Sequence, residues 1–591
     1  MSQLGALKTA KSLSDVAKLL EIDPSHLSYV LYFLNKTSPL YTTFDVPKRH
    51  GGKRTIDSPH PSLKRIQRSL SLLLQNCVAE INQARISTKG HNNNYIAHGF
   101  RRKHSIITNA RVHITRRYVF NLDLHDFFGS INFGRIRGFF LKDRNFSLHP
   151  KVATVLAQIA CYQGKLPQGS PCSPAISNLI GHLVDIPLAQ LAKRSGCTYT
   201  RYADDLTFSC NKSKFPTSIG VQDQLNNHVW LPGDALKKII QKSGFKFNES
   251  KTRMQYRDSR QEVTGLIVNR KVNVPAPYRH KVRSLVHALF TTGKFEHIYK
   301  KNDSAGDLAT NKIPGNKNEL LGMLSYIDQV DLFNKKLCLE NKAIPVNTEG
   351  RSKLYRRLLY FCNFYSASKP IIVCEGKTDN IYIKQAIIQL SPLYPRLATS
   401  TPTSVPVLNV NFFKHPDKRT RSREVMEIGD GGTPGLCKMI KNYHGDLEKF
   451  LAPPPKYPVI ILIDNDQGAK SIYKLISGIK KVEVTGLEDF VHVCKNLYVV
   501  STPLIKSLSM TDMEDFFDEE TLNTPLNDKA FKKSMNGEDN EKHYGKYRFA
   551  CEVVIQKSNS TDFSGFSGIL TRLTNAIEDY TSKLSTTITP T

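Results

Sequence analysis

The sequence predicts a chain in two parts, an α+β part followed by an α/β part with a parallel sheet. Basic loops, short strands and amphipathic helices alternate from Tyr41 to about Asn273, which is typical of an α+β domain. The composition shifts at residues 366–370. After that point the apolar runs PIIVC and PVIILI, each followed by an acid, alternate with helical patterns. Continuous apolar strands between helices favour a parallel sheet.

The net charge indicates a polyanionic partner. Among 591 residues, 83 Lys and Arg stand against 52 Asp and Glu, which gives a formal charge of +31. The basic residues occur in clusters such as PKRHGGKR, FRRKH and RHKVR rather than in one tail. A phosphate-rich partner bound along a broad surface explains this excess better than a solvated charged surface does.

Cysteine usage and hydropathy predict a cytoplasmic protein. The 11 cysteines are irregularly spaced and include no paired CxxC set, so neither a disulfide framework nor a zinc site is expected. A reducing cytosol suits them best. The N-terminus has no apolar run of signal length, and no stretch approaches ~18 uninterrupted apolar residues, so no membrane partner is expected.

Five segments are expected along the chain. Residues 1–45 form a helical segment, because SLSDVAKLL and PSHLSYVLYFLN combine helix starts with apolar spacing. Residues 46–275 are mixed, and residues 276–365 are mostly helical around the polar loop KKNDSAGDLATNKIPGNKN. Residues 366–535 form the α/β part. Residues 536–591 read as a polar extension whose end, STTITPT, is expected to be disordered.

The stretch RYADDLTFS places two aspartates side by side between strand-like runs. CTYTRY and LTFS predict a hairpin with Asp204 and Asp205 at its tip, where both carboxylates can project into a cleft. Two such charges are tolerable when a divalent cation lies between them and a polyanion. A solvated Asp-rich turn is the alternative.

A third carboxylate lies upstream. In YVFNLDLHDFF, Tyr118 to Leu122 read as a strand with Asp123 at its end. Together with the hairpin pair, Asp123 could hold two Mg²⁺ ions about 4 Å apart, which would lower the pKa of an attacking hydroxyl and stabilise leaving pyrophosphate. Asp126 is a rival ligand, but on a helical turn it would point away and serve as a cap or a surface acid.

Three motifs occur in a characteristic order: NLDLHDFF at 121–128, LPQGSPCSPAISN at 166–178 and YADD at 202–205. This ordered set resembles the palm and fingers of a reverse transcriptase. The resemblance implies a right-hand polymerase with fingers and palm in 46–275 and a helical thumb in 276–365. It also implies that Asp123, Asp204 and Asp205 are catalytic Mg²⁺ ligands and that Tyr202 flanks the primer terminus. Phe128 matches the bulky residue that selects deoxynucleotides, although a core aromatic is equally compatible with its spacing.

Further residues are assigned to the incoming nucleotide. Gly169 permits close backbone approach and Gln168 offers an amide to the base or sugar, while an ordinary turn is the alternative. Lys53 and Arg54 in GGKRTIDSP resemble the fingers cations that hold a triphosphate, as charges on a turn. Lys251 in SGFKFNESKT reaches a phosphate or faces solvent.

Two short motifs narrow the resemblance. NARVH contains Asn109 and His113, four residues apart and on one face of a helix, and VTG comprises Val263, Thr264 and Gly265. Their positions are similar to the marks of retron reverse transcriptases. By that likeness these five residues, with Lys251, contact RNA.

The retron resemblance implies a particular reaction. Such an enzyme binds a structured noncoding RNA, starts synthesis from a guanosine 2′-hydroxyl and, using dNTPs, copies part of that RNA into branched RNA–DNA (msDNA). No separate ribonuclease H carboxylate set is found, so template removal would fall to a host ribonuclease H. The oligomeric state is left open.

The second part carries its own acids. Glu375 follows the strand IIVC, Asp379 opens a helix, and Asp464 and Asp466 follow VIILI. If the two strands are parallel neighbours, their carboxyl ends bring Glu375, Asp464 and Asp466 together. The pattern resembles a TOPRIM domain, in which the glutamate serves as acid or base and the aspartates hold Mg²⁺. Chance acids at strand ends are the alternative.

One position departs from the topoisomerase form of that pattern. A third alternate Asp is missing, because residue 468 is Gly. Glu514 could substitute for it, and Gly431 and Gly432 suit a tight loop with Asp430 as a weaker ligand. The region also lacks room for a strand-passage machine, so a nuclease, whose substrate is unspecified, is preferred to a topoisomerase.

The combined interpretation is a retron reverse transcriptase fused to a TOPRIM effector that serves antiphage defence. A mobile-element or group II intron-like reverse transcriptase with a DNA-cutting domain is an alternative, although no HNH-type zinc or histidine motif is present. A nucleic-acid-binding scaffold with vestigial sites is a second alternative.

Overall fold

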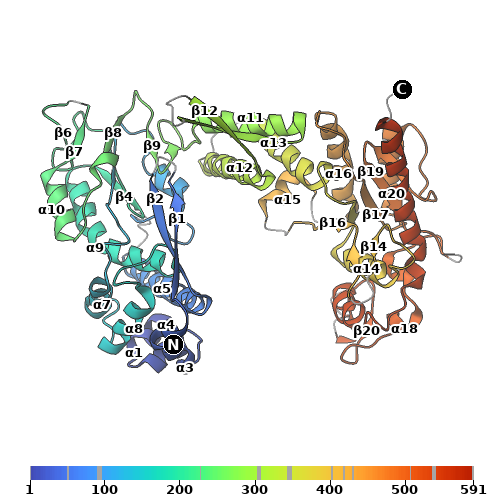
Figure 1. The fold of residues 1–591 in the computed structure, drawn as a ribbon, viewed down its shortest axis with the longest axis horizontal. Coiled ribbons are helices and arrows are strands. Elements are labelled where there is room, and N and C mark those ends of the chain that lie inside the picture. The colour runs from blue at the N-terminus through green and yellow to red at the C-terminus, as the bar shows by residue number, and fades with distance from the viewer. Residues whose placement is uncertain are drawn as a thin grey trace. The chain divides into compact units, whose positions relative to one another are not determined.

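The structure is a computed structural model that describes residues 2–588, apart from 49–51, 90–95, 227, 303–307, 342–348, 401–403, 417–419, 429–431, 506–507, 536–538 and 540. The chain divides into two compact units, shown as a ribbon in Figure 1. The first unit contains residues 1–276 and 330–344. The second unit contains residues 277–329 and 345–591.

The first unit begins with four short helices: α1 (Gln3–Thr9), α2 (Leu13–Leu19), α3 (Pro24–Tyr32) and α4 (Leu34–Thr37). Ser12 and Asp15 form a capping box at the start of α2, and the Asp23 carboxylate caps α3, which has Pro24 in its first turn. These caps explain why both predicted helices begin where they do. The buried faces of the helices join one hydrophobic core with the long helix α5 (Pro61–Lys89).

A four-stranded sheet forms the centre of this unit, with strand order β4-β5-β3-β8. The strands are β3 (Tyr118–Asp123), β4 (Thr198–Tyr202), β5 (Asp205–Cys210) and β8 (Arg253–Tyr256). Phe120 and Phe208 lie opposite each other on β3 and β5 and are fully buried. Helices in the same core are α7 (Phe133–Lys142), α8 (Pro150–Ala160), α9 (Ser173–Arg194) and α10 (Asp234–Lys242).

Helix α9 is the one helix of the described residues that is long and apolar enough to cross a membrane by length and composition alone. Half of its most apolar window is buried inside the protein. Ile176, Ile180 and Val184 face the hydrophobic core, which accounts for its composition.

Smaller elements surround this sheet. The hairpin of β1 (Tyr41–Pro47) and β2 (Lys53–Pro59) pairs in register from Tyr41 with Pro59 to Pro47 with Lys53. The others are α6 (Ile106–Arg111), the hairpin β6 (Gly220–Gln222) and β7 (Trp230–Pro232), the 3-10 turn η1 (Glu249–Lys251), and the hairpin β9 (Glu262–Val263) and β10 (Leu266–Ile267).

The chain from 276 to 360 is not purely helical. Its helices are α11 (Ala276–Thr292), α12 (Lys317–Glu340) and α13 (Glu349–Tyr360). Where the composition predicts one polar loop, β11 (Glu296–Asn302) and β12 (Leu308–Pro314) instead form an antiparallel hairpin. The predicted loop fails because polar strands satisfy their backbone groups by pairing with each other, and hydropathy does not report that pairing. Residues 303–307 lie outside the described part.

The second unit has a five-stranded sheet with order β16-β13-β17-β19-β18. Its strands are β13 (Ile371–Cys374), β16 (Asn411–Phe412), β17 (Val459–Ile463), β18 (Val491–Cys494) and β19 (Leu497–Ser501). Neighbours from β16 to β19 are parallel, and β18 is antiparallel to β19. Every residue of β13, β17 and β19 is buried, as continuous apolar runs predict. The main helices are α14 (Lys377–Gln389), α16 (Gly432–Leu447), α17 (Ala469–Lys480) and α20 (Ser567–Ile588).

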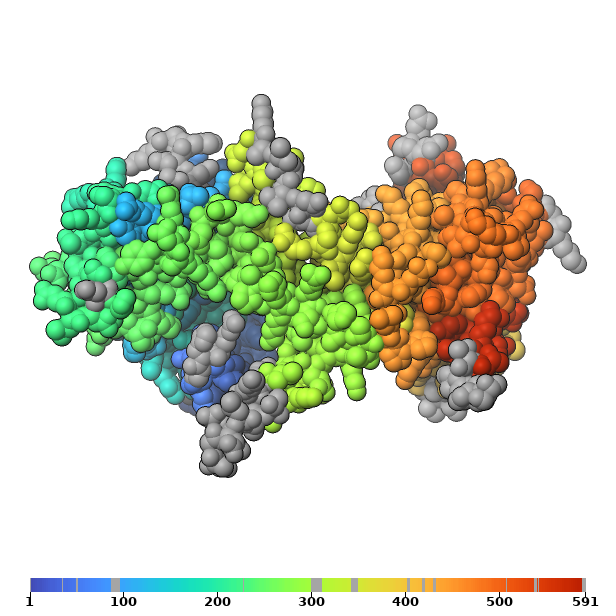
Figure 2. Space-filling view, turned by 90° about the horizontal axis from the view of Figure 1, so that it is seen from above, coloured from blue at the N-terminus to red at the C-terminus, as the bar shows by residue number. Residues whose placement is uncertain are grey.

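The C-terminal region is folded, contrary to the polar extension expected from composition. Ile569, Leu570, Leu573 and Ala576 of α20 are fully buried and share a core with β17 and β19. Figure 2 shows the red C-terminal residues set among orange ones from earlier in the chain. The apolar positions recur at helical spacing, but Ser and Thr between them lower the average hydropathy. Of the predicted disordered end, residues 585–588 belong to α20 and 589–591 lie outside the described residues.

Candidate functional site

The paired aspartates lie at the tip of a hairpin, as predicted. Tyr202 of β4 pairs with Asp205 of β5, so Ala203 and Asp204 form a two-residue turn. Ala203 has a φ of 56°, in the left-handed region. The turn packs closely on another segment, since a Cβ added at Gly99 would lie 2.6 Å from the Ala203 nitrogen.

The sheet register brings the third acid to this tip. Asp123 ends β3 and is the direct cross-strand partner of Asp205, which places the two Cα atoms ~4.5–5.5 Å apart. The Leu124 N–H donates to the Asp204 carbonyl at 3.0 Å, so the backbones remain joined past the strand end. The three carboxylates therefore lie on one edge of the sheet.

Burial and neighbouring carboxylates shift the pKa values of the two hairpin aspartates. Burial, and then the charge of Asp123, raises the pKa of Asp204. Burial, together with the charges of Asp204 and Asp123, raises the pKa of Asp205 to about 7. Asp205 is nevertheless an exposed residue, so solvent can reach it although protein atoms crowd its carboxylate. Such a site favours a bound cation.

Lys251 partly supplies that positive charge. Its Nζ lies 2.8 Å from Asp123 Oδ1, and Asn248 Nδ2 lies 3.3 Å from Asp123 Oδ2. Burial disfavours the ammonium, but Asp123 outweighs this effect and raises the pKa of Lys251 above its usual range. In this structure Lys251 thus pairs with a carboxylate, and its phosphate contact remains a prediction.

Arg201, which no sequence motif identifies, supports the turn through its backbone contact with Ala203. It is fully buried and makes two 2.8 Å bonds to the buried carboxylate of Asp185 in α9. Its Nη1 also donates to the Ala203 carbonyl at 3.1 Å. A charged residue in an otherwise buried strand, and an acid in an apolar helix, were the available sequence signals.

The LPQG loop is hydrogen-bonded to the β1–β2 hairpin. The Asp57 N–H of β2 donates to the Gln168 carbonyl at 2.7 Å. Gly169 has a φ of 134°, and a Cβ there would lie 2.4 Å from the Asp57 oxygen. The close approach predicted for Gly169 is therefore to protein backbone, and Gln168 stays half-buried beside it.

Lys53 and Arg54, the two cations predicted to hold a triphosphate, have different surroundings. Both lie on β2 rather than on a turn, with Lys53 exposed and 3.6 Å from Asp45. The charge of Arg54 reaches the trio, because it helps to lower the pKa of Asp204 against the larger effect of burial. Arg54 is thus the better placed of the two for a triphosphate.

The aromatic residues next to the acids in the sequence differ in burial. Phe127 is buried in the core, while Phe128 is half-buried with its ring 6.1 Å from that of Phe100. Tyr202 is half-buried, and burial, then Asp205, raises its pKa. Asp126 is exposed on the loop after β3, with its carboxylate against Gly129, so it is a surface acid as expected.

The two retron-like motifs form one packed unit. His113 is fully buried, with its ring nitrogens 2.7 Å from the hydroxyls of Ser209 and Thr200. Asn109 and Val263 are also fully buried, and Thr264 Oγ1 donates to the Ile106 carbonyl at 3.3 Å. The buried side chains offer no surface to RNA here, so their predicted direct contact is not supported. Gly265, with a φ of 82°, is exposed in the turn.

A second group of acids lies at one edge of the sheet in the second unit. β13 and β17 are parallel neighbours, with Cys374 opposite Leu462. Glu375 follows the first strand, and Asp464 and Asp466 follow the second, so the strand ends place all three at the same edge. Gly432 lies near Glu375, whereas Asp430 and Gly431 lie outside the described residues.

Electrostatics join these acids into one cluster. Burial, and then Asp379, Glu375, Glu514 and Asp512, raises the pKa of Asp464 to about 8. Burial and Asp466 likewise raise the pKa of Glu375. Glu514, proposed from sequence as a substitute acid, therefore lies within electrostatic reach of Asp464.

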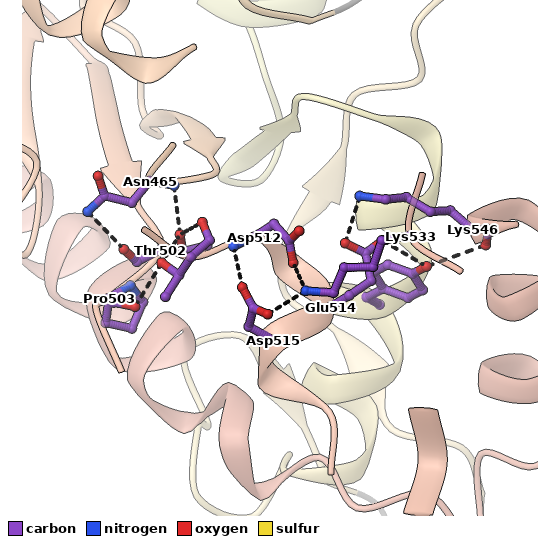
Figure 3. Close-up of polar contacts among 10 residues, drawn as sticks. Asn465, Thr502, Pro503, Asp512, Glu514, Asp515, Lys533 and Lys546 are labelled. Carbon is purple, nitrogen blue, oxygen red and sulfur yellow. Dashed lines mark hydrogen bonds and ion pairs between the residues drawn. The ribbon is translucent and has the colours of Figure 1, made fainter. Parts of the chain in front are cut away.

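Two lysines neutralise part of the cluster, as Figure 3 shows. Lys546 Nζ lies 2.8 Å from Glu514, a side chain only 1% exposed. Lys533 contacts Asp512 at 2.8 Å and also bonds Asp515. No sequence motif flagged these lysines, because they follow the acids by about 20 to 30 residues and meet them only in the fold.

The acids suit Mg²⁺ chemically, but other groups of the protein already bond several of them. Among the residues that the structure describes, no group of three or more His, Cys, Asp or Glu side chains is arranged to hold a metal. Lys251 and Asn248 donate hydrogen bonds to the Asp123 carboxylate. Asp466 and Asp379 accept backbone N–H bonds at the starts of helices α17 and α14. Asp464 Oδ1, however, is buried without a hydrogen-bond partner in the described structure. Clustered carboxylate oxygens of this kind suit Mg²⁺.

Comparison with known proteins matches the first unit. The family described as "Reverse transcriptase (RNA-dependent DNA polymerase)" matches residues 46–276. The retron Mx162 reverse transcriptase of Myxococcus xanthus is 33% identical over 48% of this chain and 60% of its own length. The retron Mx65 enzyme of the same organism is 34% identical over 42% and 55%. The chain thus spans little more than half of these two relatives.

The retron Ec86 reverse transcriptase of Escherichia coli is matched over most of its length. It is 30% identical over 49% of this chain and 83% of its own. The position of Asp123, Asp204 and Asp205 at the edge of the four-stranded sheet agrees with this match, which covers most of the relative's length. The chain therefore belongs to the retron reverse transcriptase family.

Proposed function

We propose that the first unit is an RNA-directed DNA polymerase. The observation that carries the proposal is the register that pairs Asp123 with Asp205 and places Asp204 beside them in the turn. Burial and the neighbouring carboxylates raise the pKa values of Asp204 and Asp205. With Asp123 at the same sheet edge, these acids suit a site that receives a cation and a polyphosphate. Family membership supports the same reading.

Each side chain then has a task. Asp123, Asp204 and Asp205 would hold Mg²⁺, which when bound supplies charge neutralisation and an activated hydroxyl. Arg54 binds the triphosphate, and Phe128 limits the space at the sugar. The β2–Gln168 connection orients the fingers, and Tyr202 supports the primer end. The Arg201–Asp185 pair holds the turn that carries the acids.

Primer extension on an RNA template with dNTPs and Mg²⁺ tests this proposal. Asp205→Asn should lower extension by more than about 100-fold, since even outer-shell partners of a metal contribute ~10–100-fold. Asp126→Asn is the matched control, because Asp126 is an exposed neighbour with a φ of 41° that Asn tolerates. Full extension by Asp205→Asn would refute the proposal.

We further propose that the template is a cognate structured noncoding RNA, that synthesis starts at a guanosine 2′-hydroxyl, and that a host ribonuclease H trims the branched product. Retron membership and the charge of +31 support this. Nucleic acid extracted with the purified protein should contain a 2′,5′ branch that resists ribonuclease but yields to a debranching enzyme. A linear product alone would contradict it.

For the second unit we propose a TOPRIM-like, Mg²⁺-dependent nuclease that acts as an antiphage effector. Support comes from Glu375, Asp464 and Asp466 at parallel strand ends, with an unpartnered oxygen on Asp464. Asp464→Asn should abolish both cutting of nucleic acid and phage-triggered growth arrest, while primer extension persists. Growth arrest that survives this change would remove the effector role.

A further inference from the structure

A large cleft lies beside the second acidic edge, within the second unit. Its volume is about 1380 Å³, above the ~300–1,000 Å³ of ordinary small-molecule sites. One wall is a face of α14, on which Lys377, Asn380 and Lys384 recur at helical spacing. The other wall is the edge strand β16 and the residues after it, up to Pro416. Figure 1 labels both elements.

The charge of this cleft has one sign. Its lining includes Lys317, Lys377, Lys384, Lys414 and His415 but no Asp or Glu. Within the described residues, Lys384 and Lys414 are exposed and take part in none of the ion pairs. Cations that converge on a concave surface whose lining contains no acid attract an extended anion.

Two residues of the cleft lining hold buried acceptor atoms that lack a hydrogen-bond partner in the described structure. Asn380 Nδ2 donates to the Phe413 carbonyl at 3.4 Å, and Asn380 Oδ1 is buried without a partner. His415 Nε2 lies 2.9 Å from the Cys374 carbonyl, so it must donate, and a neutral ring then leaves Nδ1 as a buried acceptor without a partner. Once turned toward a ligand, these unpartnered acceptors suit the amino groups of bases or the hydroxyls of sugars, which would also relieve the cost of leaving them unbonded.

An aromatic ring completes the set. Phe412 of β16 is half-buried in the lining. Base stacking on such a ring contributes ~1–3 kcal/mol without sequence preference. A nucleic-acid strand offers phosphates to the cations, base or sugar donors to the acceptors, and a flat base to the ring. A phosphopeptide lacks the flat base and matches these groups less well.

The cleft adjoins the acids directly. His415 bonds the carbonyl of Cys374, the residue immediately before Glu375, and Lys377 follows Glu375 by two positions. A strand that lies in the cleft would therefore run toward the acidic edge. We propose that the α14–β16 cleft binds a single nucleic-acid strand and directs it to Glu375, a role that rests on the proposed nuclease function.

Photocrosslinking of the full-length protein tests this proposal. The probes are a 12-nucleotide single strand with photoreactive bases, as DNA and as RNA, while unlabelled primer–template occupies the polymerase. Mass spectrometry should locate crosslinks in residues 408–416. The double variant Lys384→Glu/Lys414→Glu should lower their yield at least about tenfold, since each lost phosphate contact weakens binding to single strands. The DNA and RNA arms identify the preferred sugar.

Lys441→Glu is the matched control, because Lys441 is exposed on α16, outside the cleft, and carries the same charge change. It should keep the crosslinks. Phe412→Leu, which retains apolar bulk, should lower them even if the charge reversal disturbs folding. Crosslinks absent from the cleft with both strands, unchanged in both variants, or fully displaced by equimolar free nucleotide would overturn the proposal.

The same experiment separates this proposal from the nuclease function. Asp464→Asn should keep the crosslinks and lose cutting. If the wild-type protein crosslinks in the cleft but cuts no strand, the nuclease proposal fails and the binding site stands.

Discussion

Arg201 and Asp185 form an ion pair that is fully buried, which is costly unless every charge is matched. Here the guanidinium is matched by both Asp185 oxygens, by Asn178 and by the Ala203 carbonyl. The arrangement fixes the turn before Asp204. A residue that never touches substrate thus determines where two of the acids lie.

Arg201→Met should destabilise the first unit by about 3–5 kcal/mol, because it leaves the buried Asp185 carboxylate without a counter-charge. Arg201→Met combined with Asp185→Leu should regain much of that stability, since no lone charge remains. Denaturant unfolding monitored by fluorescence measures both. Primer extension should stay low in the double variant, because the bond to Ala203 is still missing; recovery of activity along with stability would contradict this role.

The second residue-level prediction concerns pH. Burial, with the nearby charge of Arg116, lowers the pKa of His113 to about 3. In the unfolded chain its pKa is about 6.5. Between these values the unfolded state binds the extra proton, so stability is retained above pH 6.5 and declines as pH falls below it, by ~1.4 kcal/mol per pH unit.

Melting temperatures measured from pH 7.5 to pH 4.5 check this expectation. The wild-type protein should lose more stability over that interval than His113→Gln, which keeps a hydrogen-bonding side chain but does not titrate. Identical slopes would show that His113 does not drive the loss.

Among the structural elements, strand β2 and the LPQG loop act together. Asp57 bonds Gln168, and Gly169 leaves no space for a side chain against the Asp57 oxygen. The loop therefore sets the position of the hairpin that carries Arg54. Nucleotide affinity is expected to depend on this backbone contact.

Gly169→Ala should raise the KM for dNTPs severalfold, because the new Cβ displaces the loop from β2. Gly164→Ala is the matched control: it has a φ of 77° but nothing within 4 Å of the added Cβ, so it introduces backbone strain of ~1–2 kcal/mol without a clash. Steady-state kinetics distinguish the two. An equal KM for both variants would show that strain, not the contact, matters.

The elements that sequence predicts well are those with local signals. The β4–β5 hairpin, the end of β3 at Asp123 and the buried runs β13 and β17 follow from alternation, turn residues and apolar length. The β11–β12 hairpin and α20 do not, since their stability comes from pairing and packing that composition conceals. The partners of Lys251, Lys546 and Arg201 also required the fold, because hydrogen bonds between distant segments have no short-range pattern.

The molecule as a whole contains two units with separate cores. Phe208 is fully buried in the core of the first, and Leu573 in the core of the second. Each core has its own sheet, and the order of strands in one does not depend on the other. Unfolding is therefore expected in two steps.

Calorimetry of core variants tests this expectation. Leu573→Ala should lower the free energy of unfolding of the second unit by about 2–5 kcal/mol, and Phe208→Ala should lower that of the first unit by about 3–5 kcal/mol. Each variant should leave the remaining transition within about 1 °C of wild type. A single transition moved by both changes would indicate one cooperative body.

The burial of α20 has a consequence for synthesis on the ribosome. The acids at 375, 464 and 466 are synthesised before Lys546 and before the residues of α20 that close the core of the second unit. The core of the first unit can form while translation continues, whereas the contact of Lys546 with the acidic cluster cannot form until that residue has been synthesised. A chain that stopped before α20 would thus retain the first unit but lack the full core of the second, and with it the cutting activity proposed above.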